Sequence, residues 1–281
     1  MLATNKAVKA IIYNRVPSVT ADFWLIKLMA VTMGETAADY LNVQMGFGLT
    51  ATSLIMSAVL LGALVWQFAQ KKYLPAPYWF SVVLISIVGT LITDNLVDNL
   101  HVPLMDTTIA FSIALVLTFL LWFQSERTLS IHSIFTDRRE AFYWLAILFT
   151  FALGTAAGDL VAEKFALGYL ATGILFAMII FSLSIGYFFL DLDPILGFWL
   201  VYILTRPLGA SFGDLMSQPA QYGGLGLGTI ITSAIFLAAI VAIVTYMSVK
   251  HEGEEVVVIG EDDGLAAVGE GEKLAVAREE P

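Results

Sequence analysis

The sequence predicts an all-α, polytopic membrane protein: a bundle of eight transmembrane helices built from four two-helix repeats. The chain is 58% hydrophobic and only 14% charged, with a mean hydropathy of +0.82, whereas globular proteins carry about 25% charged residues. Apolar runs of about twenty residues recur along most of the chain, and each is long enough to cross a bilayer core. A repeated Gly–Asp segment supports the fourfold division.

That segment joins a glycine to an aspartate and occurs four times. Each copy places Gly five residues before Asp, and Trp fifteen residues before the same Asp. The four aspartates, called the repeat aspartates below, are Asp39, Asp94, Asp159 and Asp214, and the four tryptophans are Trp24, Trp79, Trp144 and Trp199. The first two aspartates precede the last two by 120 residues each. The chain therefore consists of two 120-residue halves, each of which is itself duplicated.

The expected elements follow in order along the chain. Residues 1–21 carry three basic residues and no long apolar run, so we expect a cytosolic arm. Residues 22–249 form the transmembrane domain, with repeats at about 22–69, 77–124, 141–189 and 195–248. The helices of these repeats are expected over about 22–41, 49–69, 77–97, 105–124, 141–161, 169–189, 195–216 and 229–248.

Turn residues separate these helices. Gly46 and Gly48 break the first repeat, and Pro75 and Pro77 follow it. A polar link over 125–140 joins the two halves. Further turns are expected at 191–194, which contains two aspartates and a proline, and at the glycine-rich stretch 218–228. Glycine and proline are the strongest local breakers of regular structure.

The C-terminal residues 250–281 differ in composition from the rest. Residues 251–281 contain ten acidic residues against Lys273 and Arg278. This composition predicts a disordered, acidic cytosolic tail that offers a docking segment to a partner. The chain has no cysteine, which excludes disulfides and thiolate chemistry. It also lacks a basic patch with aromatic residues, so nucleic acid is not an expected partner.

Loop charge predicts the orientation in the membrane. Nine basic residues fall on one side if the spans alternate, and only Lys164 falls on the other. The nine are Lys6, Lys9, Arg15, Lys71, Lys72, Arg127, Arg138, Arg139 and Lys250. The positive-inside rule then places both termini in the cytoplasm. Because every repeat contains two spans, all four repeats enter the membrane in the same direction.

The repeat aspartates are the candidate functional residues. Each is expected near the outer end of a helix, where the negative end of the helix dipole disfavours a carboxylate by roughly 0.3–1 kcal/mol. Asp98 and Glu163 each follow a repeat aspartate by four residues and add a second, repelling charge to the same face. A bound cation or a shared proton would relieve this repulsion. The alternative is that these acids simply mark helix ends that reach water.

Other positions have structural or supporting interpretations. The repeated glycines are expected where helices approach closely, and the repeated tryptophans are expected in an aromatic belt at the cytosolic interface. Lys27 is expected to extend to that interface. Arg206 lies deeper and needs a carboxylate from another helix, for which Glu35 and Asp159 have the matching depth. Pro207 is expected to kink the same helix.

A second possible metal-binding face combines Asp94, Asp98 and His101. These residues are spaced so that all three lie on one side of a helix at the outer surface. A histidine beside a proline in a short loop is also compatible with simple exposure. Neither interpretation requires a permanent cofactor, and the cation, if present, is a divalent ion.

These features favour a transporter or channel-like permease for a cation over an enzyme. Four carboxylates meeting at one depth attract and select cations. Oxygen ligands suit manganese, magnesium, calcium or protons. One alternative is a membrane scaffold or accessory subunit that forms a homo-oligomer or binds a cytosolic partner through its tail. A remote alternative is an intramembrane aspartyl enzyme using Asp159 and Asp214, although the companion motifs of such enzymes are missing.

Three segments carry a resemblance to a known family. They are Ala30–Thr36 with Asp39, Gly154–Asp159, and Thr205–Ser211 with Asp214. With these repeated G-[ET]-x-x-x-D motifs, the chain from about residue 20 to 250 resembles a family of uncharacterised bacterial inner-membrane proteins described as membrane-anchored. The resemblance implies a multi-pass protein of a bacterial inner membrane and brings no activity with it.

Overall fold

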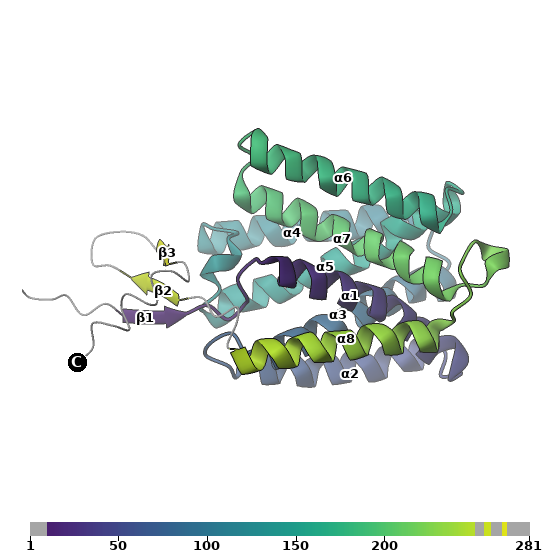
Figure 1. Ribbon diagram of the computed structural model, residues 1–281, viewed down its shortest axis with the longest axis horizontal. Helices are drawn as coiled ribbons and strands as arrows, with labels where there is room; N and C mark the ends of the chain where they lie inside the picture. Colours follow the sequence, from purple (N-terminus) through teal and green to yellow (C-terminus); the bar gives the residue numbers. More distant parts are fainter. Residues whose placement is uncertain (1–9, 251–255, 260–265, 269–281) are drawn as a thin grey trace, which may run out of the picture.

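The computed structural model describes residues 10–250, 256–259 and 266–268, and the side chains of residues 12–250. These residues form eight long helices and a small sheet at one end of the bundle (Figure 1). The helices are α1 (Ala21–Asp39), α2 (Leu49–Phe68), α3 (Pro75–Asp94), α4 (Leu104–Glu126), α5 (Asp137–Asp159), α6 (Tyr169–Phe189), α7 (Pro194–Ser217) and α8 (Thr229–Lys250).

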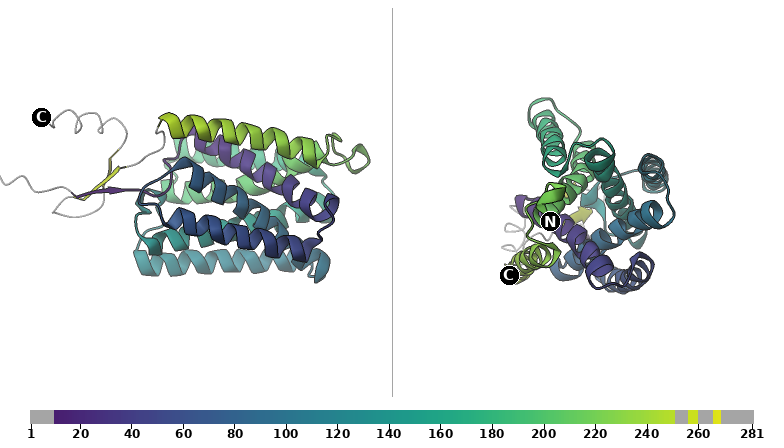
Figure 2. Two further views of the ribbon diagram at one scale, coloured as in Figure 1. Left: turned by 90° about the horizontal axis from the view of Figure 1, so that it is seen from below. Right: turned by 90° about the vertical axis from the view of Figure 1, so that its right-hand side faces the viewer.

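The odd-numbered helices form an inner ring and the even-numbered helices cover it. Around the ring, α1 packs on α3, α3 on α5, α5 on α7, and α7 on α1. Outside it, α2 packs on α3, α4 on α5, α6 on α7 and α8 on α1 (Figure 2). The second helix of each repeat therefore covers the first helix of the next repeat, and the last repeat covers the first. The four repeats form a closed ring, an arrangement that the sequence left undecided.

Burial separates the two layers. About half to two thirds of the apolar segments of α3, α5 and α7 are buried, against 11% to 22% for the even-numbered helices. Seven of the helices in the described part are long and apolar enough to cross a membrane. The expected eighth, α1, is not, because its 19 residues include Asp22, Lys27, Glu35 and Asp39. Most of α1 is nevertheless buried, because the neighbouring helices surround it.

Local signals start the inner helices where the sequence indicates. The hydroxyl of Thr20 accepts from the backbone of Phe23 at the start of α1. Thr136 caps α5 in the same way, and Asp193 caps α7. Side-chain oxygens at these positions satisfy backbone N–H groups that have no partner within the helix. Pro75 and Pro194 occupy first helical positions, where the missing N–H costs nothing.

Three inner helices continue past their repeat aspartate as a π-helix of five residues. These segments are Tyr40–Gln44, Asn95–Asn99 and Leu160–Lys164. In the fourth repeat, α7 stays α-helical to Ser217. Asp39, Asp94 and Asp159 thus lie before a further helical turn rather than at the carbonyl end, which corrects the dipole argument. π-helical turns are rare and occur often at functional sites.

The ends of the chain add a small sheet, which the sequence analysis does not predict, to the all-α bundle. Strand β1 (Ala10–Tyr13) pairs antiparallel with β2 (Val256–Ile259), which pairs antiparallel with β3 (Ala266–Val268). The run of valine and isoleucine in β2 favours extended backbone. The prediction of disorder rested on the acidic charge of the whole tail and overlooked this short run. The predicted disorder of residues 250–281 is therefore wrong for these two strands. The rest of the tail after Lys250, and residues 1–9, lie outside the described residues.

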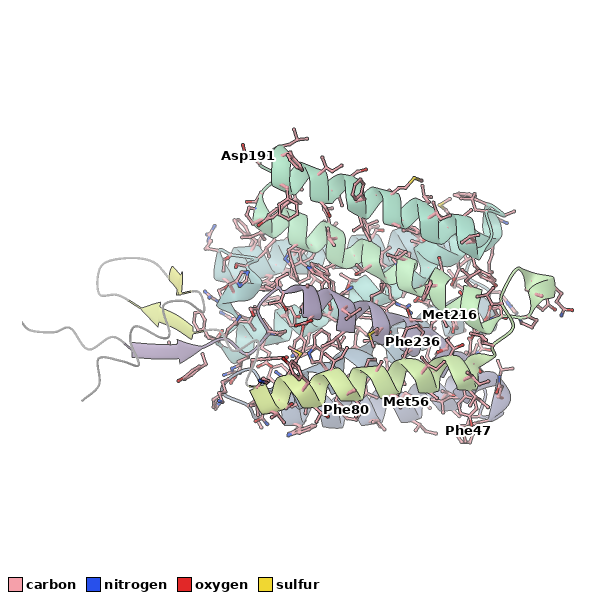
Figure 3. All side chains as sticks on the ribbon, viewed as in Figure 1. Phe47, Met56, Phe80, Asp191, Met216 and Phe236 are labelled. Atoms are coloured by element: carbon pink, nitrogen blue, oxygen red, sulfur yellow. The ribbon has the colours of Figure 1, made fainter. Side chains whose placement is uncertain are left out.

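The bundle has two chemically different ends. Phe47 and Met216 lie at the end where the repeat aspartates are found, which we call the aspartate end, and Asp191 lies at the other end (Figure 3). The small sheet adjoins the Asp191 end, which we call the tryptophan end because the repeat tryptophans lie toward it (Figure 1). Between the two ends, large apolar side chains such as Phe80 are exposed on the outer surface.

The repeat tryptophans form an internal cluster, which corrects the expected interfacial belt. Trp79, Trp144 and Trp199 are buried, and Trp24 is half-buried. Each packs on the aromatic residue that precedes the tryptophan of the previous repeat. The pairs are Trp79–Phe23, Trp144–Tyr78, Trp199–Tyr143 and Trp24–Phe198, with ring centroids 5.5–6.3 Å apart. Aromatic packing thus closes the ring at the tryptophan end.

A polar network ties the N-terminal segment to the same end. The Arg15 guanidinium donates to Glu140 at 2.8 Å and to Asp137 at 2.5 Å. Glu140 is buried and also accepts from Gln67 at 2.9 Å and from Trp144 at 3.3 Å. Burial lowers the pKa of Arg15, but the two carboxylates outweigh burial and raise this pKa above its ordinary value. The segment before α1 is therefore anchored across the start of α5.

Candidate functional site

The repeated glycines let adjacent inner helices touch. A methyl group on Gly34 would overlap Ser86, one on Gly89 would overlap Phe151, and one on Gly154 would overlap Arg206. In the last repeat, a methyl on Gly209 would overlap Val31, so the same contact closes the ring from the fourth repeat to the first. In every case the glycine faces the residue eight positions before the next repeat aspartate. The expectation of close helix approach at these glycines is confirmed.

The residues four positions before the repeat aspartates form one layer across the ring. They are Glu35, Thr90, Thr155 and Ala210. The Nη2 atom of Arg206 donates to all three polar members of this layer, at 2.7 Å to Glu35 Oε2 and 2.8 Å to Thr155 Oγ1, and also to Thr90 Oγ1. Thr90 in turn donates to Glu35 Oε2 at 3.2 Å. One guanidinium nitrogen therefore joins all four repeats.

Arg206 is fully buried and only partly satisfied. Its ion pair with Glu35 confirms one of the two partners that the sequence allowed. The Nε and Nη1 atoms of Arg206 have no hydrogen-bond partner among the described residues. A buried donor without a partner costs about 1–3 kcal/mol. All hydrogen bonds of the guanidinium in its present position thus come from Nη2, while its other two nitrogens make none with the described residues.

Lys27 is also buried, which corrects the expectation that it reaches the interface. Only 1% of its surface is exposed. Its ammonium donates to the backbone carbonyl of Tyr202 at 2.8 Å and to the hydroxyl of Thr205, and it lies 3.8 Å from the centroid of the Tyr202 ring. Helix α7 directs it inward because it supplies both acceptors. The Phe151 ring lies near both interior cations, with its centroid 5.5 Å from Lys27 Nζ and 5.6 Å from Arg206 Cζ.

Each repeat aspartate lies about one helical turn beyond this layer, toward the aspartate end. All four interact electrostatically with Glu35, and Asp39 interacts with each of the other three. Asp214 is buried, whereas Asp39, Asp94 and Asp159 are half-buried. None of these four carboxylates accepts a hydrogen bond within the described part of the chain. The carboxylates therefore repel one another and Glu35, and no protein donor in the described residues compensates their charge.

The supporting acids lie further out. Asp98 and Glu163 are exposed, and each repels acids of the same end, as the four-residue spacing predicts. His101 is exposed in the loop after the second π-helix and lines a surface pocket with Lys164 and Phe165. In residues 10–250, no three His, Asp or Glu side chains converge as ligands of one metal ion. The proposed face of Asp94, Asp98 and His101 is therefore not assembled, because His101 follows the end of the helical segment.

The sequence also contains a pattern that marks the layer of Glu35, Thr90 and Thr155, in addition to the repeated glycine and aspartate. Aligning the four repeats on their aspartates places Glu35, Thr90 and Thr155 at one position and Arg206 at another. Three of the four copies are polar at the first position, although it lies within an apolar span. From sequence alone, the hydroxyls of Thr90 and Thr155 can either line a polar path or bond back to the preceding turn. Both bond back, at 3.2 Å to Ser86 O and 3.2 Å to Phe151 O, and they also bind Arg206.

The comparison with protein families agrees with this architecture. Four segments match the model of one family, described as Repeat of Unknown Function (DUF347), over residues 23–73, 77–128, 142–191 and 197–251. Each match corresponds to one of the four two-helix units that form the ring. No curated protein and no solved structure matches the chain.

Proposed function

We propose that this chain, which belongs to that family of repeats of unknown function, is an integral membrane permease for a cation. The observation that carries the proposal is that all four repeat aspartates lie at one end of a closed ring, close enough to Glu35 to repel its carboxylate. Uncompensated carboxylates at one depth lower the energy of a cation that enters among them. Acids within a span are functional candidates by default, since burying them for packing alone is costly.

The membrane placement follows from the outer surface and the loop charges. The even-numbered helices and α7 expose apolar side chains that a bilayer would cover. The basic residues Arg15, Lys71, Lys72 and Arg127 lie in segments that precede or join the helices at the tryptophan end, and Arg138 lies in the first turn of α5. The positive-inside rule therefore assigns the tryptophan end to the cytoplasm of a bacterial inner membrane, and the aspartate end to the outside.

The route for the cation is the axis of the ring. From outside, an ion meets the repeat aspartates first and then the layer of Glu35, Thr90 and Thr155. Further in, Lys27 repels cations, and the aromatic cluster closes the axis. Transport therefore needs a second arrangement of the inner helices, as alternating access requires. Helix α7 is the element suited to move, because Pro207 removes a helical hydrogen bond in its middle.

The direct test is cation flux into vesicles. The chain is reconstituted with an internal fluorescent reporter, and Mn²⁺, Mg²⁺, Ca²⁺ or a pH step is applied outside. We expect Asp159→Asn combined with Asp214→Asn to reduce uptake of the transported cation by at least about tenfold, which corresponds to about 1.4 kcal/mol. Asp191→Asn, an exposed acid at the opposite end, is the matched control and leaves uptake unchanged. Equal uptake by wild type and the double variant would refute the permease.

The scaffold alternative gives the opposite pattern. If the acidic tail is a docking segment and the ring only a frame, deletion of residues 251–281 removes binding partners, while the aspartate variants have no effect. A permease retains flux after that deletion.

A further inference from the structure

Resting on the proposed function, we propose that Glu35, Thr90 and Thr155 form an axial site for a monovalent cation, and that Arg206 occupies it in this structure. Three oxygens from three different repeats converge on the single nitrogen Arg206 Nη2. The Oε2–Nη2 and Oγ1–Nη2 distances of 2.7 and 2.8 Å are those of charge-assisted hydrogen bonds. A cationic group is thus already bound by an oxygen set that helices α1, α3 and α5 hold in place.

The charge of the oxygen set selects the class of ion. It contains one carboxylate and two neutral hydroxyls, so its charge of −1 balances one positive charge. A divalent ion is typically held by several charged ligands, and no three acidic or histidine side chains converge on one point in residues 10–250. Alanine at the fourth equivalent position, Ala210, adds no charge and leaves room on the α7 side. Lys27, which also lies close to the Phe151 ring, further disfavours a double charge.

The hydrogen bonding of Arg206 indicates that its guanidinium can move away from Glu35. Its buried Nε and Nη1 atoms lack acceptors, so a position of the guanidinium that supplies acceptors for them is favoured. Asp159 lies within electrostatic reach of Arg206 and accepts no hydrogen bond in the described part of the chain. A shift of the guanidinium toward Asp159 exchanges one carboxylate partner for another. A monovalent cation that then takes the place of Arg206 beside Glu35 leaves that carboxylate with one positive partner, as before.

The surrounding backbone permits this movement. The Arg206 side chain runs past Gly154, where any side chain would overlap its Cβ and Cγ atoms. Gly158, one turn further toward the aspartate end, faces Pro207. Two glycines of α5 therefore lie against Arg206 and Pro207, so no side chain at these positions obstructs a shift of this part of α7. The charged groups near the path from Glu35 to Asp159 are Glu35, the repeat aspartates and Lys27.

The test is equilibrium binding of ²²Na⁺ to the purified full-length chain in nanodiscs, with choline replacing Na⁺ at constant ionic strength. Arg206→Gln removes the internal competitor, and we expect it to bind Na⁺ at least about tenfold more tightly than wild type. Adding Thr90→Val and Thr155→Val keeps the side-chain shape and deletes two oxygen ligands. We expect this to weaken binding by about tenfold to thirtyfold, at about 1 kcal/mol per hydroxyl.

The matched control uses two other buried threonines of the same helices. Thr93 and Thr150 bond to backbone carbonyls and do not touch Arg206. Adding Thr93→Val and Thr150→Val to Arg206→Gln leaves Na⁺ affinity within about twofold. The proposal is overturned if Arg206→Gln binds no more tightly than wild type, or if the two threonine pairs behave alike.

Two further comparisons keep the result interpretable. If Arg206→Gln does not fold, both threonine pairs are compared in the wild-type background at higher Na⁺, and equal affinities overturn the site. Binding is measured without a gradient, so it is independent of transport. Na⁺ binding that depends on Thr90 and Thr155, together with unchanged flux in the aspartate variants, refutes the permease and leaves the axial site standing.

Discussion

Replacing Gly89 with alanine tests whether the inner helices touch as tightly as the ring requires. The added Cβ would lie 2.9 Å from Phe151 Cβ, 3.3 Å from the backbone nitrogen of Ala152 and 3.4 Å from the Phe151 carbonyl carbon. These atoms are fixed to the backbone of α5, so rotation of a side chain cannot remove the overlap. Helix α3 or α5 must shift instead, and both also pack on other helices of the bundle.

The expected magnitude comes from comparison with a glycine in open space. Gly62 lies within α2, and a Cβ there would meet nothing within 4 Å. Alanine at either position gains about 0.5–1 kcal/mol from helix propensity. Only the change at residue 89 adds overpacking, which costs about 1–3 kcal/mol. We therefore expect the free energy of unfolding of Gly89→Ala to fall about 1–3 kcal/mol below that of Gly62→Ala.

Equilibrium unfolding in mixed micelles, titrated with SDS and followed by tryptophan fluorescence, measures this difference. The buried tryptophans of the inner helices make the signal sensitive to loss of the ring. If Gly89→Ala were as stable as Gly62→Ala, the inner helices would not be in contact at the repeated glycines, and the closed ring would be refuted.

Two further predictions concern the tryptophan end and use the same unfolding assay. Glu140→Gln should destabilise the chain by about 3 kcal/mol, because Arg15 loses its buried partner. Asp137→Asn is the control: the side chain of Asp137 is 74% exposed, so its loss should leave stability close to wild type. Equal losses of stability in the two variants would contradict this prediction. Tyr78→Phe breaks the 2.6 Å hydroxyl contact with Tyr143 and should cost about 1–3 kcal/mol, while the double variant with Tyr143→Phe should cost less than the two single changes added together. Simple additivity would show that the two hydroxyls do not interact.

The fourfold repeat and the helix positions could be predicted because they depend on local patterns. The spacing between glycine, tryptophan and aspartate can be read directly from the sequence. Apolar runs of about twenty residues show which segments form long helices. The family match confirms the four repeats. Ring closure could not be predicted, because it depends on which helix covers which. The contact of α8 with α1 joins segments about 200 residues apart in the sequence.

The candidate site was predicted unevenly for similar reasons. The pairing of Arg206 with Glu35 could be foreseen, because a buried charge needs a partner at its own depth. The burial of Lys27 could not, since its acceptors on Tyr202 and Thr205 belong to the far end of the sequence. The tryptophans were expected at an interface because an indole suits that position, and nothing local shows that neighbouring repeats supply aromatic partners instead. The strands at the chain ends pair residues about 250 positions apart, which no local pattern reveals.

The way in which α8 covers α1 limits how many units such an assembly can have. Once the last helix occupies the outer surface of the first, a fifth unit has no place to attach, so growth into a filament or a longer solenoid is blocked. A related chain with only two units would leave both edges uncovered and would need a second copy to complete the circle. Such a half-length relative would then be an obligate two-fold symmetric dimer. Every residue would occur twice in that dimer, so it could not contain a single pair such as Glu35 and Arg206.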